Sequence, residues 1–133
     1  MSPDQTAAME NCLHTYFNVG DINEVSITGL QAAPFNDFAA GAAGVRSVEN
    51  DSVLRITRET NRVYPDATGT VEIHDAKWRR TIRVEKANAQ STVVWNPWVA
   101  KAKAMPDFGD DEWPGMICIE TANVADNALH LNP

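Results

Sequence analysis

The sequence predicts an all-β, antiparallel domain. Short segments that alternate between polar and apolar residues and are rich in Val, Ile and Thr recur between turn signals, which is the pattern of half-buried strands. One stretch carries the helical spacing of apolar residues. The 133 residues, 44% of them hydrophobic and 22% charged, suit a single globular domain spanning residues 1–133.

The first half of the chain predicts a hairpin, a loop and a meander. Strands are expected at 12–19 and 24–30, joined as a hairpin by the turn residues 20–23. The stretch 31–50 is rich in alanine and glycine and poor in bulky apolar residues, so it is predicted to be a long surface loop. Strand patterns resume at 53–58, 70–74 and 78–85, which fits an antiparallel meander.

The second half predicts further strands around one short helix. A β-branched run at 91–95 leads into Asn96 and Pro97, an N-cap followed by proline at the first helical position. The helix is expected over residues 97–105, and Pro106 ends it. Three segments follow the helix: an acidic loop at 107–115, a strand at 116–121 and a last strand at 128–131.

Charge and composition exclude several classes of partner. Eleven Lys and Arg against 18 Asp and Glu give a net charge of −7, which repels phosphate backbones and anionic lipids, so neither nucleic acid nor membrane is expected as a partner. No apolar stretch approaches the roughly 20 residues of a membrane helix. No signal-peptide pattern is seen near the start, so a cytoplasmic protein with two free thiols is expected.

A histidine and a glutamate are the candidate acid–base pair. Cys12, His14 and Tyr16 share one strand face, and Glu120 lies in the frame Met-Ile-Cys-Ile-Glu, where an ionised group needs a partner or a use. Imidazole and carboxylate together can move protons near neutral pH. The residues alone leave the alternative open that His14 is a core histidine and Glu120 an edge glutamate.

A metal site is not expected from the sequence. Cys12-x-His14 offers two ligands on one face of a strand. A structural zinc site needs four convergent ligands, and neither His74 nor His130 belongs to a second close pair.

Several motifs occur in one order along the chain. They include Leu13-His14-Thr15-Tyr16-Phe17, Arg62-Val63-Tyr64, Val93-Val94-Trp95-Asn96-Pro97-Trp98, and Met116-Ile117-Cys118-Ile119-Glu120 with Asn123-Val124. Together they resemble the hexose-6-phosphate mutarotases, the aldose 1-epimerase-like family, from His14 to about Leu131. The resemblance implies an antiparallel β-sandwich of the galactose mutarotase type, here truncated to the C-terminal half, with a sugar cleft on the concave face of a large sheet.

The resemblance also implies catalytic roles. In that family the histidine protonates the ring oxygen of an aldose and the glutamate takes the proton of the anomeric hydroxyl, which carries over to His14 and Glu120 as the catalytic pair. The ring opens, rotates and closes as the other anomer, with no metal or organic cofactor. The expected substrate is a hexose or hexose 6-phosphate, and the alternative function is a non-catalytic carbohydrate-binding or assembly module.

Two departures from the family pattern bear on function. Asn61 stands in Thr-Asn-Arg-Val-Tyr where the family usually has an aspartate that holds sugar hydroxyls, so Asn61 is the expected substrate-binding residue, with a weaker hydrogen bond than a charged group makes. The chain also lacks the family's N-terminal half, which leaves sheet edges and an apolar face uncovered. A homodimer or larger assembly is therefore expected to cover them.

Overall fold

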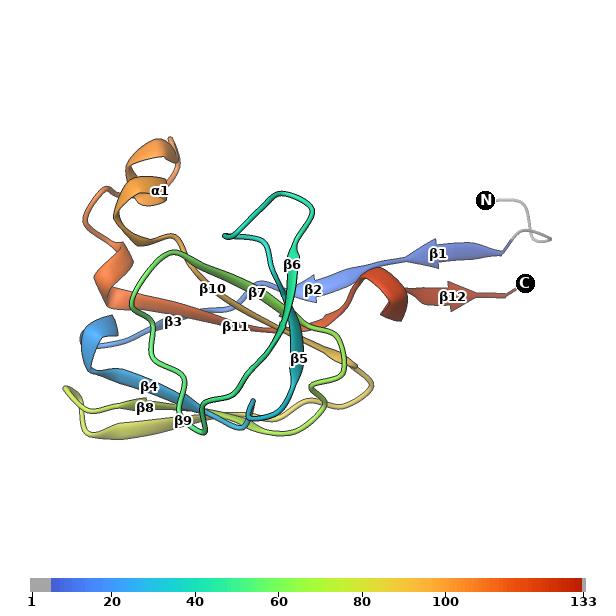
Figure 1. Cartoon of the computed structure of the whole chain (residues 1–133), viewed down its shortest axis with the longest axis horizontal. Coiled ribbons are helices and arrows are strands. Elements are labelled where there is room, and N and C mark those ends of the chain that lie inside the picture. The colour runs from blue at the N-terminus through green and yellow to red at the C-terminus, as the bar shows by residue number, and fades with distance from the viewer. Residues whose placement is uncertain (1–5, 133) are drawn as a thin grey trace.

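The computed structural model describes residues 6–132 and is built of antiparallel strands with one α-helix, which confirms the predicted fold class (Figure 1). The strands are β1 (Ala7–Met9), β2 (Asn11–Leu13), β3 (Tyr16–Asn18), β4 (Val25–Thr28), β5 (Pro34–Asp37), β6 (Val45–Val48), β7 (Thr60–Tyr64), β8 (Val71–Asp75), β9 (Arg80–Val84), β10 (Ser91–Asn96), β11 (Met116–Asn123) and β12 (Leu129–Leu131). The helix is α1 (Trp98–Ala104), and the single 3-10 turns are η1 (Ile22–Glu24), η2 (Trp113–Gly115) and η3 (Ala125–Asn127). None of these helical segments has the length and apolar character that crossing a bilayer requires.

The strands form two layers and a short ribbon. A seven-stranded sheet has the order β2-β11-β10-β7-β5-β6, and β3 also pairs with β11. A three-stranded sheet, β4-β8-β9, lies against it, and β1 pairs with β12 in a two-stranded ribbon that extends away from the two layers (Figure 1). Every pairing in these sheets is antiparallel.

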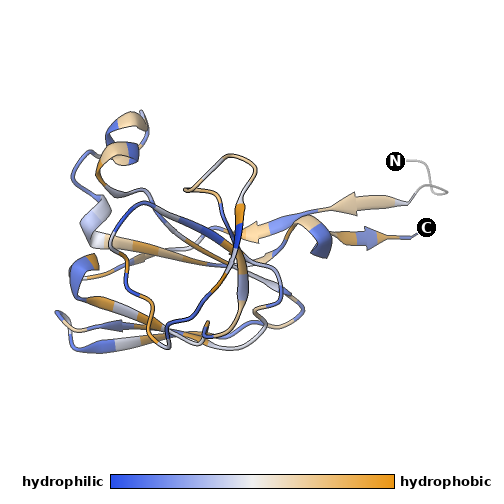
Figure 2. Ribbon diagram, in the orientation of Figure 1, coloured by the Kyte–Doolittle hydropathy of each residue, from blue (hydrophilic) through white to orange (hydrophobic). Residues whose placement is uncertain are grey.

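The main core fills the space between the two sheets. Val94, Ile117 and Ile119 of the large sheet are buried in one cluster with residues of β4 and β8, and hydrophobic residues occur along the strands of both layers (Figure 2). Each fully buried Val or Ile contributes roughly 1.5–3 kcal/mol relative to an exposed one. Because side chains alternate along a strand, the neighbours of Ile117 and Ile119, namely Cys118 and Glu120, face the other side of the large sheet.

The predicted helix at 97–105 is α1. The N-cap residue is Pro97 and not the predicted Asn96, so the proline precedes the first helical residue. The Asn96 side chain still accepts a hydrogen bond from the Trp98 backbone N–H at 2.9 Å. Its amide donates to the carbonyls of Trp113 and Met116, both at 2.9 Å, which ties the start of the helix to β11. The Trp98 ring packs on Trp113 with 4.4 Å between ring centroids. One asparagine thus holds three segments of the chain together.

The hairpin predicted between 12–19 and 24–30 is wrong. The first segment pairs with β11 as two short strands, β2 and β3, whereas the second forms β4 and pairs with β8 in the other sheet. The connecting residues form η1, where the Asp21 carboxylate accepts from the Asn23 N–H at 3.0 Å. The turn residues were recognised, but they carry the chain from one layer to the other.

The surface loop predicted at 31–50 is also wrong. The segment forms β5 and β6, which pair with each other at the end of the large sheet, and β5 also pairs with β7. The Phe35 ring is buried against Tyr64, with 5.2 Å between centroids, and the Arg62 guanidinium lies over the Phe35 ring, 4.6 Å from its centroid. Few apolar residues suffice here because Phe35 is packed by Tyr64 and Arg62, which are distant in sequence.

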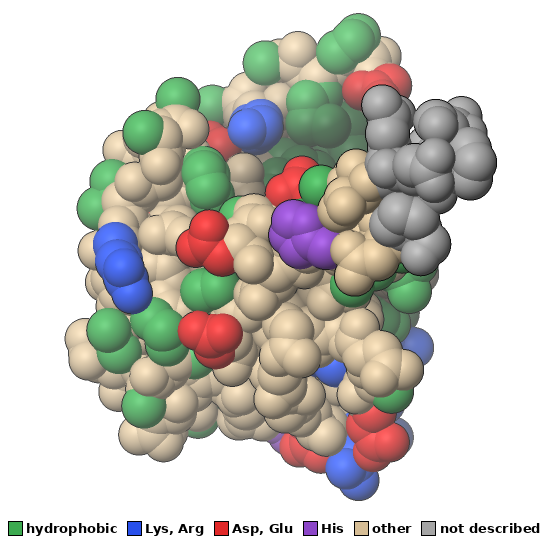
Figure 3. All heavy atoms as spheres, turned by 90° about the vertical axis from the view of Figure 1, so that its right-hand side faces the viewer, with side chains coloured by type: hydrophobic (Ala, Val, Ile, Leu, Met, Phe, Trp, Pro, Cys, Tyr) green, Lys and Arg blue, Asp and Glu red, His purple; other side chains and the backbone are tan. Residues whose placement is uncertain are grey.

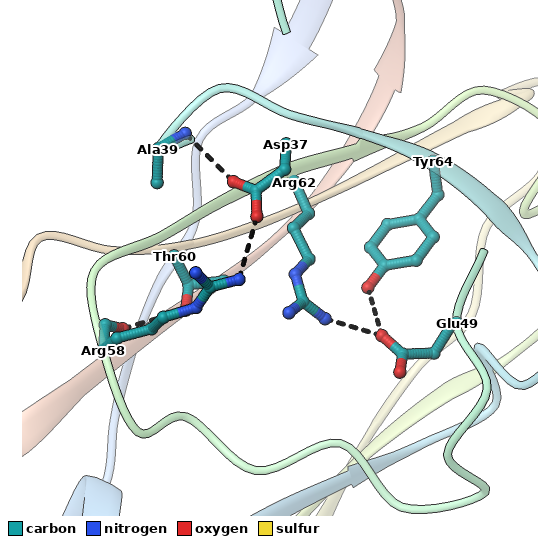
Figure 4. Close-up of polar contacts among 7 residues, drawn as sticks. All are labelled: Asp37, Ala39, Glu49, Arg58, Thr60, Arg62 and Tyr64. Carbon is teal, nitrogen blue, oxygen red and sulfur yellow. Dashed lines mark hydrogen bonds and ion pairs between the residues drawn. The ribbon is translucent and has the colours of Figure 1, made fainter. Parts of the chain in front are cut away.

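A buried ion pair fixes the neighbouring strand β7, which the sequence did not predict. The Arg62 Nη1 atom lies 2.6 Å from the Glu49 Oε2 atom, and the Tyr64 hydroxyl donates to the same oxygen at 3.0 Å (Figure 4). Arg58 pairs with the buried Asp37 at 3.2 Å. The strand predicted at 53–58 is reduced to an isolated bridge between Leu54 and Ile27.

The other predicted strands are present. Those expected at 70–74, 78–85, 91–95, 116–121 and 128–131 correspond to β8, β9, β10, β11 and β12. Both cysteines are free thiols. The segments with clear alternation of apolar residues are therefore the ones that sequence reasoning located.

Candidate active site

The pairing of β2 and β3 with β11 brings His14 opposite Glu120. Leu13 lies opposite Thr121, and Tyr16 lies opposite Cys118 in the same register. His14 falls between the two short strands, and its side chain projects on the face of the large sheet that points away from the core. Figure 3 shows the end of the molecule from which the β1–β12 ribbon projects, with acidic side chains scattered over its surface.

His14 and Glu120 are in direct contact. The Nε2 atom of His14 lies 3.3 Å from the Oε1 atom of Glu120. The two side chains differ in access to solvent, because 49% of the His14 side chain is exposed and only 4% of the Glu120 side chain. The carboxylate therefore lies at the bottom of the site, and the imidazole lies at its mouth.

Two thiols complete the surroundings of the pair. The Cys12 thiol donates to the Oε2 atom of Glu120 at 2.8 Å, and the Cys118 sulfur lies 3.7 Å from the His14 Nδ1 atom. Removal of the Cys12 thiol from water, together with its hydrogen bond to the Glu120 carboxylate, raises the pKa of Cys12 to about 12. Burial, followed by the charge of Glu120, raises the pKa of Cys118 as well. Both thiols are protonated at neutral pH.

Aromatic rings hold the imidazole in place. Tyr16 stacks on His14 with 4.9 Å between centroids, and Trp95 meets His14 edge-on at 5.6 Å. Trp95 is itself buried against Met116 and Cys118. Tyr16 and Trp95 also contact each other, with 5.9 Å between centroids, so the three rings pack as one cluster that forms a wall of the site.

A hollow of about 400 Å³ adjoins Tyr16. Phe108, Asp111 and Glu112 of the loop after α1 line it together with Met116. Its volume falls within the range of small-ligand sites. A larger hollow of about 550 Å³ lies on the three-stranded sheet, beside Arg80 and its partner Asp75, away from the His14–Glu120 pair.

Asn61 lies on the same face as the pair but not in contact with it. It is opposite Trp95 in the β7–β10 register, and Trp95 is opposite Cys118 in the β10–β11 register. Two strand spacings, about 10 Å, therefore separate β7 from the strand that carries Glu120.

Sequence reasoning located His14 and Glu120 but missed the role of the cysteines. It paired Cys12 with His14 as possible metal ligands, whereas the structure groups His14 with Cys118 and Glu120, whose ligand atoms all lie within 4.8 Å of one another. The alternation of Cys118 and Glu120 along β11 was the available signal. The alternation of residues along β11 does not indicate that β2 and β3 are the strands that pair with it beside Cys118 and Glu120.

The comparisons with known proteins agree with this architecture. A putative mutarotase (YeaD) from Salmonella typhimurium matches with a TM-score of 0.85 and 33% identity, over 96% of this chain and 42% of that one. The solved structure of HI1317 matches with a TM-score of 0.80 and 28% identity, over 96% and 44% of the two chains. The fold is therefore that of the mutarotase-like β-sandwiches.

The sequence comparisons give the family. The family model described as aldose 1-epimerase matches residues 3–133, and the chain belongs to this family. A protein of Cenchrus ciliaris named "Putative glucose-6-phosphate 1-epimerase" is 40% identical over 111 residues, and one of the same name from Haemophilus influenzae is 35% identical over 112. The aligned residues make up 84% of this chain in both cases, but only 33% and 38% of those relatives.

Proposed function

We propose that the protein interconverts the anomers of a hexose or hexose 6-phosphate, with His14 as general acid and Glu120 as general base. The observation that carries the proposal is the 3.3 Å contact between His14 Nε2 and Glu120 Oε1, on the face of the large sheet that points away from the core. The family to which the chain belongs and the names of its relatives support an aldose epimerase.

The proposed reaction moves one proton on and one proton off. The protonated imidazole of His14 gives its proton to the ring oxygen of the sugar while Glu120 takes the proton of the anomeric hydroxyl. The bond between C1 and the ring oxygen breaks, and the C1–O1 bond becomes the carbonyl of a free aldehyde. After rotation about the C1–C2 bond, closure runs with both roles reversed, so both groups return to their starting states.

The resting geometry supports these roles. The Oε2 atom of Glu120 accepts the hydrogen bond of the Cys12 thiol, so Oε1 is the oxygen available to a sugar hydroxyl. The His14 imidazole is half-exposed, so an incoming sugar reaches it from solvent. Stacking of Tyr16 restricts the orientation of the His14 ring. A sugar that enters between the two groups replaces their contact with one to each of its oxygens.

We assign Asn61 to substrate binding on the same face. Its carboxamide accepts hydrogen bonds from sugar hydroxyls but lacks the charge that makes such a bond about twice as strong. Asn61→Asp is therefore expected to lower KM several-fold with a smaller change in kcat. An unchanged KM for both Asn61→Asp and Asn61→Ala would remove Asn61 from the site.

The test is anomer exchange followed by NMR. Exchange between the α and β anomeric protons of glucose and of glucose 6-phosphate is measured for the wild-type protein, Glu120→Gln and the control Glu85→Gln. Glu85 is an exposed glutamate directly after β9 of the three-stranded sheet, paired with Arg83. Glu120→Gln is expected to lose about 10²-fold or more of the catalysed rate, and Glu85→Gln none.

The alternative outcomes are distinct. Equal rates for wild type and Glu120→Gln contradict the catalytic assignment. Binding of sugar without exchange supports the alternative, a non-catalytic carbohydrate-binding module. Far-UV circular dichroism of both variants shows whether a lost rate reflects a lost fold.

We also propose that the chain acts as one truncated sandwich domain, as a homodimer or larger assembly in the cytoplasm. A single cooperative urea transition tests the one-domain proposal, and cell fractionation tests the location. Exposed apolar residues at the strand edge β6 support self-association.

A further inference from the structure

Three potential metal ligands converge where the His14 imidazole meets the buried side chains of Cys118 and Glu120. His14, Cys118 and Glu120 each offer one ligand atom, and these atoms lie within 4.8 Å of one another. The measured contacts are 3.3 Å between His14 Nε2 and Glu120 Oε1 and 3.7 Å between Cys118 Sγ and His14 Nδ1. Ligand bonds of about 2.0–2.3 Å at tetrahedral angles place neighbouring ligand atoms about 3.3–3.8 Å apart. The two measured contacts involve different nitrogens of the His14 ring, and an ion binds only one of them. The three ligand atoms, which lie within 4.8 Å of one another, therefore reach tetrahedral spacings through a small rotation of the half-exposed imidazole.

The chemical types of the three ligand atoms indicate which ion the cluster would bind. A sulfur, an imidazole nitrogen and one carboxylate oxygen suit Zn²⁺ and its softer relative Cd²⁺, whereas Mg²⁺ and Ca²⁺ take oxygen ligands. Cys118 and Glu120 are fixed on the central strand β11, and His14 is held by Tyr16 and Trp95. The exposed side of His14 leaves a fourth position for water, as in open zinc sites.

We propose that the protein reversibly binds a zinc-like divalent ion through His14, Cys118 and Glu120, and that the bound ion inhibits anomer exchange. The inhibition rests on the proposed function, but the binding does not. An ion held by the imidazole nitrogen and the carboxylate oxygen occupies the lone pairs that carry the two protons of the reaction. The ion is thus an inhibitor of this site, not a cofactor for it.

Binding is a simple exchange of a proton for a metal. The S–H bond of Cys118 breaks, a sulfur–metal bond forms, and the proton leaves to solvent. His14 binds as the neutral imidazole and Glu120 as the carboxylate. No oxidation or reduction takes place, and binding is expected to strengthen as the pH rises because a proton is released.

The experiment is a titration of the metal-free protein with Cd²⁺. The ultraviolet charge-transfer band of cadmium–thiolate reports sulfur ligation, and the chain has only two cysteines to supply it. One equivalent of Cd²⁺ is expected to saturate the band. Cys118→Ser is expected to lose the band and the matched variant Cys12→Ser to keep it, and excess Mg²⁺ is expected not to displace the ion.

A second variant covers the case in which Cys118→Ser fails to fold. His14 is half-exposed, so His14→Ala leaves the core intact, and it is expected to weaken the Cd²⁺ Kd by at least about tenfold. The absence of a band, unchanged affinity in His14→Ala, or loss of the band in Cys12→Ser instead of Cys118→Ser overturns the binding proposal.

Activity measurements separate the two proposals. If the protein exchanges anomers, one equivalent of Cd²⁺ or Zn²⁺ is expected to abolish the rate, and a chelator to restore it. Full activity with the band saturated overturns the inhibition. If the metal-free protein catalyses no exchange, the proposed function fails while the thiolate band still decides whether the ion binds.

Discussion

The Cys12 thiol shows how one residue responds to a neighbouring carboxylate. It belongs to an exposed residue, yet its pKa is about 12 because the thiol is shielded from water and bonded to Glu120. At pH 8 a thiol with this pKa has about a thousandfold less thiolate than a thiol with the usual pKa of 9.0. The thiolate of the higher pKa is a stronger nucleophile, which offsets about 20-fold of the loss in rate. Alkylation of Cys12 by iodoacetamide is therefore expected to be about 50-fold slower in the folded than in the unfolded chain.

The pH dependence of the Cys12 alkylation rate and the variant Glu120→Gln test whether the raised pKa of Cys12 slows alkylation. Below the pKa the thiolate fraction rises tenfold per pH unit, so the rate is expected to keep rising between pH 9 and 10 in the folded chain and to level off in the unfolded chain. Mass spectrometry separates Cys12 from Cys118. Glu120→Gln removes the negative charge and is expected to raise the Cys12 rate about tenfold. Equal rates in folded and unfolded wild type would contradict the shifted pKa.

The strand β7 is stabilised by a buried ion pair between its Arg62 and Glu49, the residue directly after β6. Removal of one partner of such a pair costs about 3–5 kcal/mol because the other charge is left buried, here that of Arg62, whose side chain is 15% exposed. Glu49→Ala is therefore expected to lower the free energy of unfolding by about 3 kcal/mol in urea denaturation. The control Glu59→Ala removes the half-exposed pair with Lys101 and is expected to cost less than about 1 kcal/mol. Equal losses in the two variants would show that the Glu49 pair is not stabilising β7.

The same element shows the limits of prediction from sequence. Strands such as β10 and β11 were predictable because their apolar residues alternate or run together, a local signal. The strands β5 to β7 were missed because their stability comes from Glu49, Arg62 and Tyr64, residues whose contacts are set by the fold. In the candidate active site, too, local signals were predictable and contacts set by the fold were not. His14 and Glu120 could be singled out by residue type and motif, but the opposing register and the contacts of Cys118 depend on strand pairing across more than 100 residues.

At the scale of the whole molecule, the described chain leaves strand edges open. The strand β6 ends the large sheet, and its Val45 and Val48 side chains are 50% and 47% exposed. The ribbon of β1 and β12 extends from the sandwich and exposes Met9 and Leu131 (Figure 1). The solved relatives are more than twice as long, and this chain covers 42% and 44% of them. Apolar edges of this kind pair with another strand or aggregate unless they are covered.

We therefore expect self-association through β6. Light scattering after size-exclusion chromatography at tens of micromolar is expected to give twice the 14.6 kDa mass of the chain or more. Lysines on an edge strand block strand addition, so the double variant Val45→Lys with Val48→Lys is expected to shift the protein to monomer. Val99→Lys, at an exposed apolar position on α1 outside the sheets, is expected to leave the mass unchanged. A monomeric wild type at these concentrations would contradict the assembly. A double variant that stays dimeric would instead place the contact away from β6, with the β1–β12 ribbon as the next edge to alter.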